Sequence, residues 1–437
     1  MPETTTHETT AGNYFVANYP PFSFWKPGRV SEAFEALEVA PAPGTPLGLY
    51  VHIPFCRKRC HFCYFKVYTD KNASEVKRYL DAVIEELRLY AGKPFLGGRK
   101  PRFIYFGGGT PSYLSVDQLR SLTDRLKELL PWDNAEEVAF EAEPGTLTNP
   151  KLEAIKEMGV TRLSLGVENF DDRILEINGR AHRSKEIFRA YQFASTLGFD
   201  QINIDLIAGM VEEREENWAD CVRRAIELSP DSVTIYQMEI PFNTTIYQEM
   251  KTEGKLIAPV ADWETKRRWV GEAFAEFEKA GYTVTSAYTV VRDPAKTKFL
   301  YRDLLWQGAD LLGLGVASFS HISGTHFQNE HNNEPYLETV NQGKLPIYRA
   351  LRTTEEERLV RELILQLKLG RVSVDYFQEK FGVNIRERFA AQFGKLEEDG
   401  FLTSNKDTVK LTRDALLQVD SLLHQFFLPE HQHARYA

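Results

Sequence analysis

The sequence predicts an α/β protein with a parallel sheet, followed by a C-terminal unit of helical, winged-helix-like character. Short runs rich in β-formers recur roughly every 30 to 40 residues, and amphipathic helical patterns lie between them. Alternation of this kind is typical of βα units that build a parallel sheet. After about residue 350 the pattern changes to consecutive helices and one hairpin, which indicates a separate unit.

Six runs have the length and composition of buried strands. They are Leu47–Ile53, Arg102–Gly108, Glu136–Glu143, Arg162–Glu168, Gln201–Gly209 and Ser232–Ile240. With the helical patterns that follow them, they predict six βα units, (β/α)6, that build a parallel sheet.

Local signals place several helix ends. Ser74 is expected to begin the helix after the first strand, and Ser115 with Gln118 forms a capping box for the next helix. A helix is expected to begin at Thr148, and Gly159 ends it.

The C-terminal unit begins near Arg352 with a capping box predicted at Thr353 and Glu356. Three helical patterns and the hairpin-like stretch 401–412 follow, which resembles a winged helix. Acidic residues match basic residues along these helices, so a lid or substrate platform is favoured over nucleic-acid binding.

Composition excludes several classes of protein. The 437 residues are 43% hydrophobic and 12% aromatic, which is globular rather than disordered, and the net charge of −9 does not favour nucleic acid. No run approaches the roughly 20 apolar residues of a membrane span, and no signal peptide is visible. Four cysteines form no disulfide framework, so a cytoplasmic, reducing compartment is expected.

Three of the four cysteines, Cys56, Cys60 and Cys63, fall within eight residues. Incidental thiols or a disulfide explain this spacing poorly. Structural zinc needs four ligands, and His61 could supply the fourth, but no second ligand pair follows. Closely spaced thiolates are typical ligands of iron–sulfur clusters, and three of them leave one iron of a 4Fe–4S cluster open. The fourth cysteine, Cys221, lies in a helical pattern and is expected to be buried.

Polar and glycine residues gather at the carboxyl ends of the predicted strands. The cysteines follow the first strand, Gly107, Gly108 and Gly109 end the second, and carboxylates end the next three. This edge of a parallel barrel carries the chemistry, so one site is expected there. The carboxylates in question are Glu141, Glu143, Glu168 and Asp205.

These motifs resemble the radical S-adenosylmethionine (SAM) superfamily and, within it, the oxygen-independent coproporphyrinogen III oxidase-like family. The C-x3-C-x2-C spacing with Phe62 before the last cysteine carries the superfamily resemblance. Four further stretches occur in the order found in the family, namely Tyr105–Ser112, Glu141–Leu147, Arg162–Asp172 and Ile202–Met210. The resemblance implies an open three-quarter barrel of radical SAM type.

The resemblance also implies the site's ligands. Cys56, Cys60 and Cys63 would hold a 4Fe–4S cluster, and one or two SAM molecules would bind nearby. The SAM contacts would come from Tyr50, Phe62, Gly107, Gly108, Gly109, Thr110, Glu141, Glu168, Arg180 and Asp205. Tyr50 would also act in catalysis. Glu168 stands where the family has glutamine, and an ionised carboxylate cannot donate a hydrogen bond.

The family activity is oxidative decarboxylation of porphyrinogen propionates, so a tetrapyrrole is the implied substrate and reduced flavodoxin or ferredoxin the implied electron donor. Related methyltransferases, cyclopropanases and heme-degrading enzymes share the cluster and stay as an alternative. A heme chaperone without catalysis is a second alternative. Residues 16–25 resemble the segment before the barrel in the oxidases, and residues 299–315 lack the chaperones' His-Asn pair.

Four segments are therefore expected. Residues 1–45 form an irregular extension, 46–290 the radical SAM barrel, 291–350 a barrel-closing segment, and 351–437 the winged-helix-like domain and tail. His321 and His326, in the closing segment, are expected to be exposed loop histidines, with substrate binding as the alternative.

Overall fold

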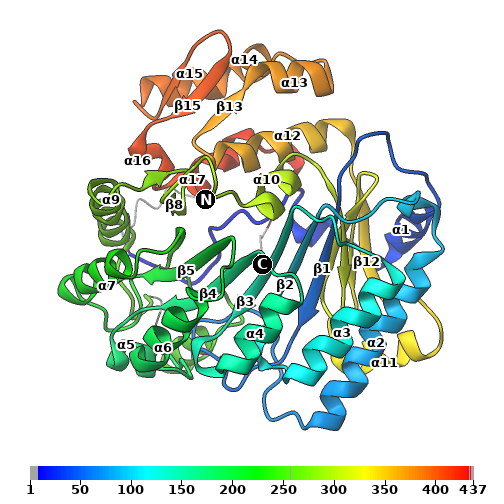
Figure 1. Ribbon diagram of the computed structural model, residues 1–437. Helices are drawn as coiled ribbons and strands as arrows, with labels where there is room; N and C mark the ends of the chain where they lie inside the picture. The colour runs from blue at the N-terminus through cyan, green and yellow to red at the C-terminus, as the bar shows by residue number, and fades with distance from the viewer. Residues whose placement is uncertain (1–7, 256, 433, 435–437) are drawn as a thin grey trace. The chain divides into compact units, whose positions relative to one another are not determined.

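The structure is a computed structural model that describes residues 8–255, 257–432 and 434 (Figure 1). The chain divides into two compact units that interleave along the sequence. One unit comprises 25–205 and 298–353, and the other comprises 1–24, 206–297 and 354–437. The first is called the barrel unit here because it carries the first strands of the predicted barrel, and the second is called the C-terminal unit.

The sheet of the barrel unit is parallel in its centre. Strands β1 to β4 follow one another in space as in sequence, and β9 pairs in parallel on the other side of β1. Three antiparallel strands extend this edge in the order β10, β11, β12. The bounds are β1 Leu47–Ile53, β2 Phe103–Gly108, β3 Glu137–Ala142, β4 Arg162–Glu168, β9 Asp310–Leu314, β10 Phe319–Ile322, β11 Thr325–Asn329 and β12 Ile347–Arg352. Strand β5, Gln201–Ala208, lies beside β4 and runs on into the C-terminal unit.

Helices of the barrel unit cover one face of these strands, as Figure 1 shows for α2, α3, α4 and α11. Their bounds are α1 Val30–Leu37, α2 Ala73–Ala91, α3 Val116–Leu129, α4 Asn149–Glu157, α5 Asp172–Ile177, α6 Ser184–Ala194, α10 Leu300–Trp306 and α11 Asn333–Asn341. Buried apolar residues recur along α2 and α3 at helical spacing, so each helix presents one apolar stripe to the sheet.

Among the described residues, the C-terminal unit contains two groups of antiparallel strands and nine α-helices. In the first group, which belongs to the twelve-stranded sheet, β8 pairs with β6 and β7, and the second group is a separate sheet in which β15 lies between β13 and β14. The strands are β6 Ser232–Gln237, β7 Thr283–Val284, β8 Thr289–Val291, β13 Arg371–Ser373, β14 Leu402–Ser404 and β15 Thr408–Leu411. The helices are α7 Glu215–Leu228, α8 Thr245–Glu253, α9 Trp263–Lys279, α12 Glu355–Leu367, α13 Val374–Phe381, α14 Ile385–Arg388, α15 Ala390–Glu398, α16 Arg413–Leu416 and α17 Val419–Leu423.

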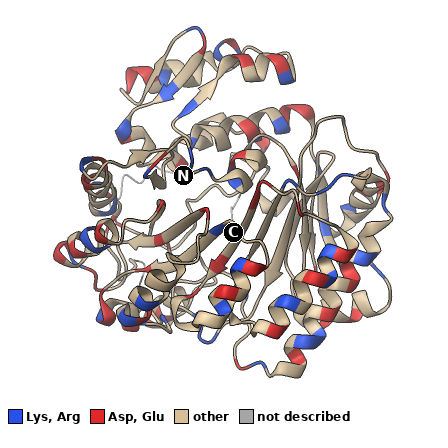
Figure 2. Cartoon of the chain, viewed as in Figure 1, with Lys and Arg blue, Asp and Glu red and all other residues tan. Residues whose placement is uncertain are grey.

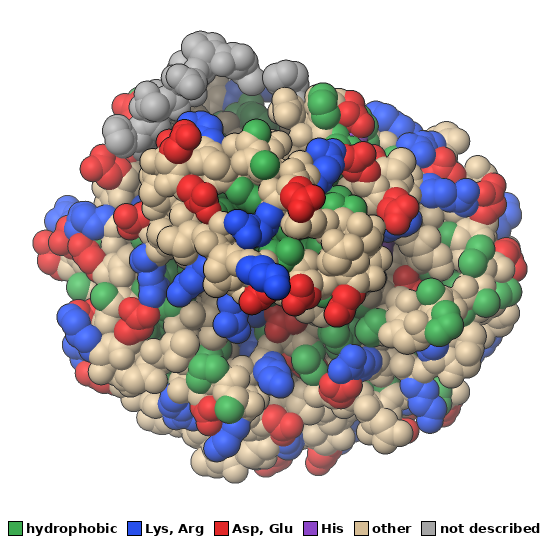
Figure 3. Space-filling view, turned by 90° about the horizontal axis from the view of Figure 1, so that it is seen from above, with side chains coloured by type: hydrophobic (Ala, Val, Ile, Leu, Met, Phe, Trp, Pro, Cys, Tyr) green, Lys and Arg blue, Asp and Glu red, His purple; other side chains and the backbone are tan. Residues whose placement is uncertain are grey.

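Acidic and basic residues are interspersed along α12 to α15 (Figure 2). The face drawn in Figure 3 likewise mixes both signs rather than gathering one of them. Nucleic-acid binding requires a basic patch or stripe, so these surfaces give it no support.

All six predicted strands are present, with ends that differ by at most three residues. The capping box at Ser115 and Gln118 is confirmed, and Cys221 is buried in α7 as expected. The box predicted at Thr353 and Glu356 is wrong by one residue, because Thr354 and Glu357 exchange the capping hydrogen bonds. Two adjacent threonines precede a run of three glutamates, so the pattern fits either register equally well.

Two further local expectations differ from the structure. Helix α2 begins earlier than expected, with Asn72 as its N-cap and Ser74 inside the first turn. The segment 1–45, expected to be irregular, contains helix α1, whose Ala33, Ala36 and Leu37 are buried. Because prolines lie on both sides of this helix, its short apolar stripe is difficult to recognise in the sequence.

Candidate active site

The three clustered cysteines lie on one loop between β1 and α2. The backbone N–H of Cys56 donates to Tyr68 O at 3.1 Å, and Tyr68 N–H donates to Pro54 O at 2.8 Å, which closes the loop. Cys63 N–H donates to Cys60 O at 3.2 Å in a tight turn. Cys56 is buried and the other two are half-buried, and all three are free thiols.

Polar groups from other strands and turns approach two of the thiols. Thr110 Oγ1 lies 3.3 Å from Cys56 Sγ, and Arg180 Nη1 donates to Cys60 Sγ at 3.3 Å. Burial raises the pKa of Cys56 to about 11 and that of Cys63 to about 12. Metal binding must therefore displace protons from these thiols.

Among the described residues, no three His, Cys, Asp or Glu side chains converge on a single metal ion. The thiolates of an iron–sulfur cluster bind different irons, so this chemistry does not require convergence on one point.

Arg180 connects the cysteine loop to the carboxylates. Its guanidinium is largely buried, and Nη2 donates to Gly166 O at 2.6 Å. Burial acts to lower the pKa of Arg180, but the neighbouring Cys60, Glu168 and Glu143 outweigh burial and raise it. Its Nε is buried and has no acceptor among the residues that the structure describes. A spare buried donor of this kind fits an anionic ligand group.

Glu141 and Glu168 are largely buried carboxyls at the carboxyl ends of β3 and β4. Tyr105 donates its hydroxyl to Glu141 Oε1 at 2.5 Å, and Gly108 N–H donates to Oε2 at 3.2 Å. Burial, with the charge of Asp205, raises the pKa of Glu141 to about 7. Burial also raises the pKa of Glu168 to about 7, against the effect of Arg180, whose Nη2 lies 3.6 Å from Glu168 Oε1.

Asp205 completes this carboxylate group from β5. Ser164 Oγ donates to its Oδ2 at 3.0 Å, and Asn203 Nδ2 donates to its Oδ1 at 2.9 Å. The negative charge of Asp205 raises the pKa of both Glu141 and Glu168, so the three carboxyls repel one another; they are called the carboxylate pocket below. Neither Ser164 nor Asn203 was predicted as a site residue, although Asn203 lies two residues before Asp205 on β5 and Ser164 lies on the neighbouring strand β4.

The backbone at Glu168 is unusual. Its φ is +65°, and Asn169 N–H donates to Val167 O at 2.8 Å, which is the pattern of a classic γ-turn. A non-glycine residue at positive φ is uncommon and is found more often at functional sites. The turn fixes the direction in which the Glu168 side chain extends from the end of β4.

Close contacts within the protein explain why glycines stand at the end of β2. A Cβ atom at Gly108, where φ is +110°, would lie 2.6 Å from the ring of His52. A Cβ at Gly109 would lie 2.9 Å from the backbone of Pro54. These glycines therefore let β2 approach the start of the cysteine loop, while their contact with SAM stays a prediction.

Tyr50 of β1, Tyr105 of β2 and Tyr301 have neighbouring rings, and these three residues are called the aromatic wall. The ring centroids of Tyr105 and Tyr301 are 4.4 Å apart, and those of Tyr50 and Tyr105 are 5.9 Å apart. The Tyr50 hydroxyl lies 3.0 Å from His52 Nδ1. Burial lowers the pKa of His52 to about 4, so its ring is neutral near pH 7. Phe62, predicted to contact SAM, is half-buried in the cysteine loop.

Tyr301 comes from helix α10. Glu137, the first residue of β3, accepts the N–H groups of Leu300 and Tyr301 at 3.0 and 2.9 Å. Glu137 thereby fixes the start of the helix. The sequence signal for Tyr301 is weak because core packing explains an aromatic in this position equally well.

Glu143 has a partner on each side. Arg57, from the cysteine loop, donates to both its oxygens at 3.0 to 3.1 Å, and His182 Nδ1 lies 3.0 Å from Oε1. Burial acts to raise the pKa of Glu143, but His182, Arg57 and Arg180 together lower it to about 2. Glu143 therefore ties the cysteine loop to the end of β3.

The expectation that His321 and His326 are exposed is wrong. Both are buried, on the paired strands β10 and β11, with their Nδ1 atoms 3.0 Å apart. Trp25 stacks on His326 with ring centroids 4.9 Å apart and an interplanar angle of 6°. The hairpin brings the two rings together across the ladder, a pairing that residue spacing does not reveal.

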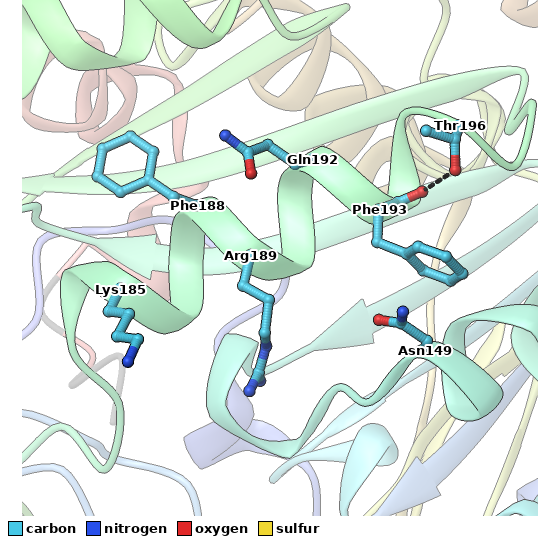
Figure 4. Close-up of a pocket in the computed structure, with 7 residues that line it drawn as sticks. All are labelled: Asn149, Lys185, Phe188, Arg189, Gln192, Phe193 and Thr196. Carbon is cyan, nitrogen blue, oxygen red and sulfur yellow. Dashed lines mark hydrogen bonds between the residues drawn. The ribbon is translucent and has the colours of Figure 1, made fainter.

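A shallow depression of about 630 Å³ lies over helix α6 and the start of α4 (Figure 4). Lys185, Phe188 and Arg189 line it, and Arg189 also donates to Leu147 O at 2.9 Å. None of the predicted site residues lines it, so it is separate from the carboxylate pocket.

Comparisons with known proteins place the chain in a family. A radical SAM superfamily profile matches residues 50–225, and a HemN C-terminal domain profile matches residues 353–417. The heme chaperone HemW of Bacillus subtilis is 30% identical over 84% of this chain and 96% of its own length. The oxygen-independent coproporphyrinogen III oxidase of Salmonella typhimurium is 27% identical over 91% of this chain and 89% of its own.

A solved structure agrees with these relatives. Coproporphyrinogen III oxidase (HemN) from Escherichia coli, described as a radical SAM enzyme, matches with a TM-score of 0.81 and 25% identity. The match covers 96% of this chain and 99% of that one. The chain belongs to the radical SAM superfamily, in the oxygen-independent coproporphyrinogen III oxidase-like family.

The predicted fold class, an open parallel barrel of radical SAM type with a C-terminal helical unit, is thereby confirmed. By family the chain is a radical SAM oxidoreductase of the coproporphyrinogen III oxidase type, and the family implies a 4Fe–4S cluster and SAM. Among the described residues, no helix is both long and apolar enough to cross a membrane.

Proposed function

We propose that the chain reductively cleaves SAM at a 4Fe–4S cluster and decarboxylates propionate side chains of a porphyrinogen oxidatively. The observation that carries this proposal is the match to the Escherichia coli oxidase over nearly the full length of both chains. Sequence relatives add support, because the oxidase alignment extends over 91% of this chain and the chaperone alignment over 84%.

Cys56, Cys60 and Cys63 would hold the cluster. The donor set fits, because three free thiols share one closed loop and Arg180 places a guanidinium hydrogen bond on Cys60. A hydrogen bond from a cation stabilises thiolate charge. Thr110 would do the same for Cys56 through its hydroxyl.

SAM would lie against the carboxylate pocket. Glu141, Glu168 and Asp205 offer acceptors for ribose hydroxyls and for the ammonium group, and their mutual repulsion favours a cationic ligand. The spare Nε of Arg180 would meet the carboxylate of SAM. When bound, the cluster and SAM supply hydrogen-atom abstraction by a 5′-deoxyadenosyl radical.

The aromatic wall would orient a flat substrate. Tyr50, Tyr105 and Tyr301 present rings from two strands and one helix, and stacking of aromatic faces suits a tetrapyrrole. The Tyr50 hydroxyl, held near the neutral His52, would offer a polar group to the substrate. Tyr50 thereby keeps the catalytic role expected from the sequence.

The test is anaerobic purification, reconstitution with iron and sulfide, and reduction in the presence of SAM. We expect 5′-deoxyadenosine to form, to increase with coproporphyrinogen III, and to accompany loss of substrate carboxylates by mass spectrometry. If the formation of 5′-deoxyadenosine does not depend on coproporphyrinogen III, the proposed substrate is wrong, although the radical chemistry still holds.

A heme chaperone is the second candidate, favoured by the 30% identity to such a protein from Bacillus subtilis. It predicts a stable heme absorption band after mixing and no 5′-deoxyadenosine from a fully loaded cluster. That combination would overturn the enzyme proposal.

A further inference from the structure

The shallow depression over helix α6 lies outside the site described above, and its lining combines three kinds of side chain. Two cations, Lys185 and Arg189, and two amides, Asn149 and Gln192, line it together with phenylalanine rings. The chain has 62 acidic residues, and none of those that the structure describes lines this depression. A concave surface with cations, amides and aromatic rings but no acid suits an anionic ligand that carries an aromatic ring.

Helix α6 has an apolar stripe toward the core and a second stripe that lines the depression. The lining residues recur every three or four positions from Lys185 to Thr196, so they share one side of the helix. The outer side of a surface helix normally carries polar and charged residues. Here it also carries Phe188 and Phe193, both half-buried. Solvation alone does not account for two aromatic rings on this stripe.

The two cations of the depression are not neutralised within the protein. Lys185 is exposed and forms no ion pair with any residue that the structure describes. Arg189 donates from Nη2 to the backbone oxygen of Leu147 at 2.9 Å, and no described carboxylate pairs with it. Glu186, the acidic neighbour of Lys185 in the sequence, accepts the backbone N–H of Arg183 at 2.8 Å instead. Both cations therefore keep N–H groups for an anion.

The charged and aromatic groups lie at different positions along α6. Figure 4 shows Lys185 and Arg189 extending on the same side of the helix, with Phe193 and Asn149 farther along it. Phe188 packs on Phe170, with ring centroids 5.7 Å apart, whereas Phe193 stacks on no aromatic ring among the described residues. From Lys185 to Phe193 the helix rises about 12 Å, at 1.5 Å per residue. An extended nucleoside diphosphate can span this distance.

We infer that the depression binds a nucleoside diphosphate. Lys185 and Arg189 would hold the phosphates, because ammonium and guanidinium groups are the usual side-chain partners of phosphate. The base would stack on Phe193, and the amide of Asn149 would offer a donor and an acceptor to its edge. The inference does not rest on the proposed function, because none of the predicted site residues lines the depression.

The test is calorimetric titration of the reconstituted protein with ADP, in the presence of saturating SAM. Saturating SAM keeps the adenine of ADP out of the SAM site, so the remaining binding reports on the depression. The variants are Lys185→Glu and Phe193→Leu. The matched control is Lys100→Glu, which reverses the charge of another exposed lysine in the barrel unit. Adenosine and inorganic phosphate are titrated separately as the two parts of the ligand.

We expect Lys185→Glu to weaken ADP binding by roughly tenfold at low salt, and by less at high salt, because salt screens charges. Phe193→Leu keeps an apolar side chain but removes the ring, so it should weaken binding by roughly fivefold or more. Lys100→Glu should bind ADP like the unchanged protein. Adenosine and phosphate should each bind much more weakly than ADP.

Several results would contradict the inference. Absence of ADP binding at millimolar concentration would mean that the depression is an incidental hollow between two helices. Binding that SAM abolishes, or that Lys185→Glu leaves unchanged, would mean that ADP binds elsewhere. Phosphate that binds as tightly as ADP would overturn the role of Phe193 and with it the nucleotide.

A second readout does not depend on the folding of any variant. A photoreactive azido analogue of ADP is crosslinked to the unchanged protein in the presence of SAM, and mass spectrometry identifies the labelled peptides. We expect the label on α6 or α4, and an excess of ADP should prevent it. A label on other peptides alone would overturn the inference. A thermal melt of each variant without ADP verifies that a loss of binding is not a loss of folding.

Discussion

The raised pKa values of Glu141 and Glu168 predict that SAM binding depends on pH near neutrality. Burial holds the pKa of each carboxyl at about 7, with Asp205 adding to the effect. Below that pH the pocket carries protons on these groups, and above it the pocket carries more negative charge. A ligand with a sulfonium and an ammonium group must bind better to the ionised pocket.

The size of the effect follows from the titration. A group of pKa 7 is ionised to about 10% at pH 6 and to about 90% at pH 8, so each required carboxylate contributes roughly tenfold in affinity. Two such groups give up to about a hundredfold, and they titrate as a coupled pair rather than singly. We expect SAM affinity to rise from pH 6 to pH 8 by a factor between these limits.

The perturbation is Glu168→Gln, which keeps the shape of the side chain and removes its titration. Equilibrium dialysis of labelled SAM with the reconstituted protein gives Kd at each pH. In the variant the rise in affinity between pH 6 and pH 8 should shrink to about tenfold or less, since Glu141 alone remains.

Glu86 provides a matched control. Burial also raises its pKa to about 7, but three donors, Tyr336, Gly315 and Asn329, already fill its oxygens. Glu86→Gln should leave the pH dependence of SAM binding unchanged, with a thermal melt to verify folding. Equal slopes for the wild type and Glu168→Gln, or a flat wild-type profile, would refute the reasoning.

Three further predictions concern the loop, the glycine run and the aromatic wall. Cys60→Ala should abolish iron and sulfide loading, whereas Cys221→Ala should load fully, as elemental analysis can show; equal loading would contradict the ligand assignment. Gly108→Ala forces a side chain into positive φ and against His52, so denaturant unfolding should show a loss of at least about 2 kcal/mol. Tyr301→Leu should raise KM for the porphyrinogen by about threefold to tenfold, while substrate-free cleavage of SAM, measured as 5′-deoxyadenosine, stays unchanged. A change in SAM cleavage without a change in KM would indicate that Tyr301 contacts SAM rather than the porphyrinogen.

The strands of the barrel were predictable because each is a short, nearly continuous apolar run bounded by turn residues. In β1, six of seven residues are buried, so no alternation was needed to recognise it. The edge where the site lies followed from the same reasoning, since the carboxyl ends of parallel strands meet there. Hence the sequence alone assigns Cys56, Glu141 and Asp205 to one region.

The partners of these residues could not be predicted, because they arise from contacts between distant segments. Arg57 is separated from Glu143 by 86 residues, and Arg180 from Cys60 by 120. Spacing carries no information on such pairs. The γ-turn at Glu168 is equally invisible, because glutamate has no preference for positive φ that a sequence pattern could show.

Electrostatics therefore divides the four acidic positions of the site into two functions. Glu143 has a depressed pKa because Arg57 and His182 hold its charge, and it remains ionised whatever the ligand. Glu141 and Glu168 have raised pKa values because burial and Asp205 oppose their charge, so a ligand can still change their ionisation. Clustered carboxyls with perturbed pKa values are candidates for ligand binding. On this argument we propose that Glu143 maintains the cysteine loop and that Glu141, Glu168 and Asp205 bind cationic SAM.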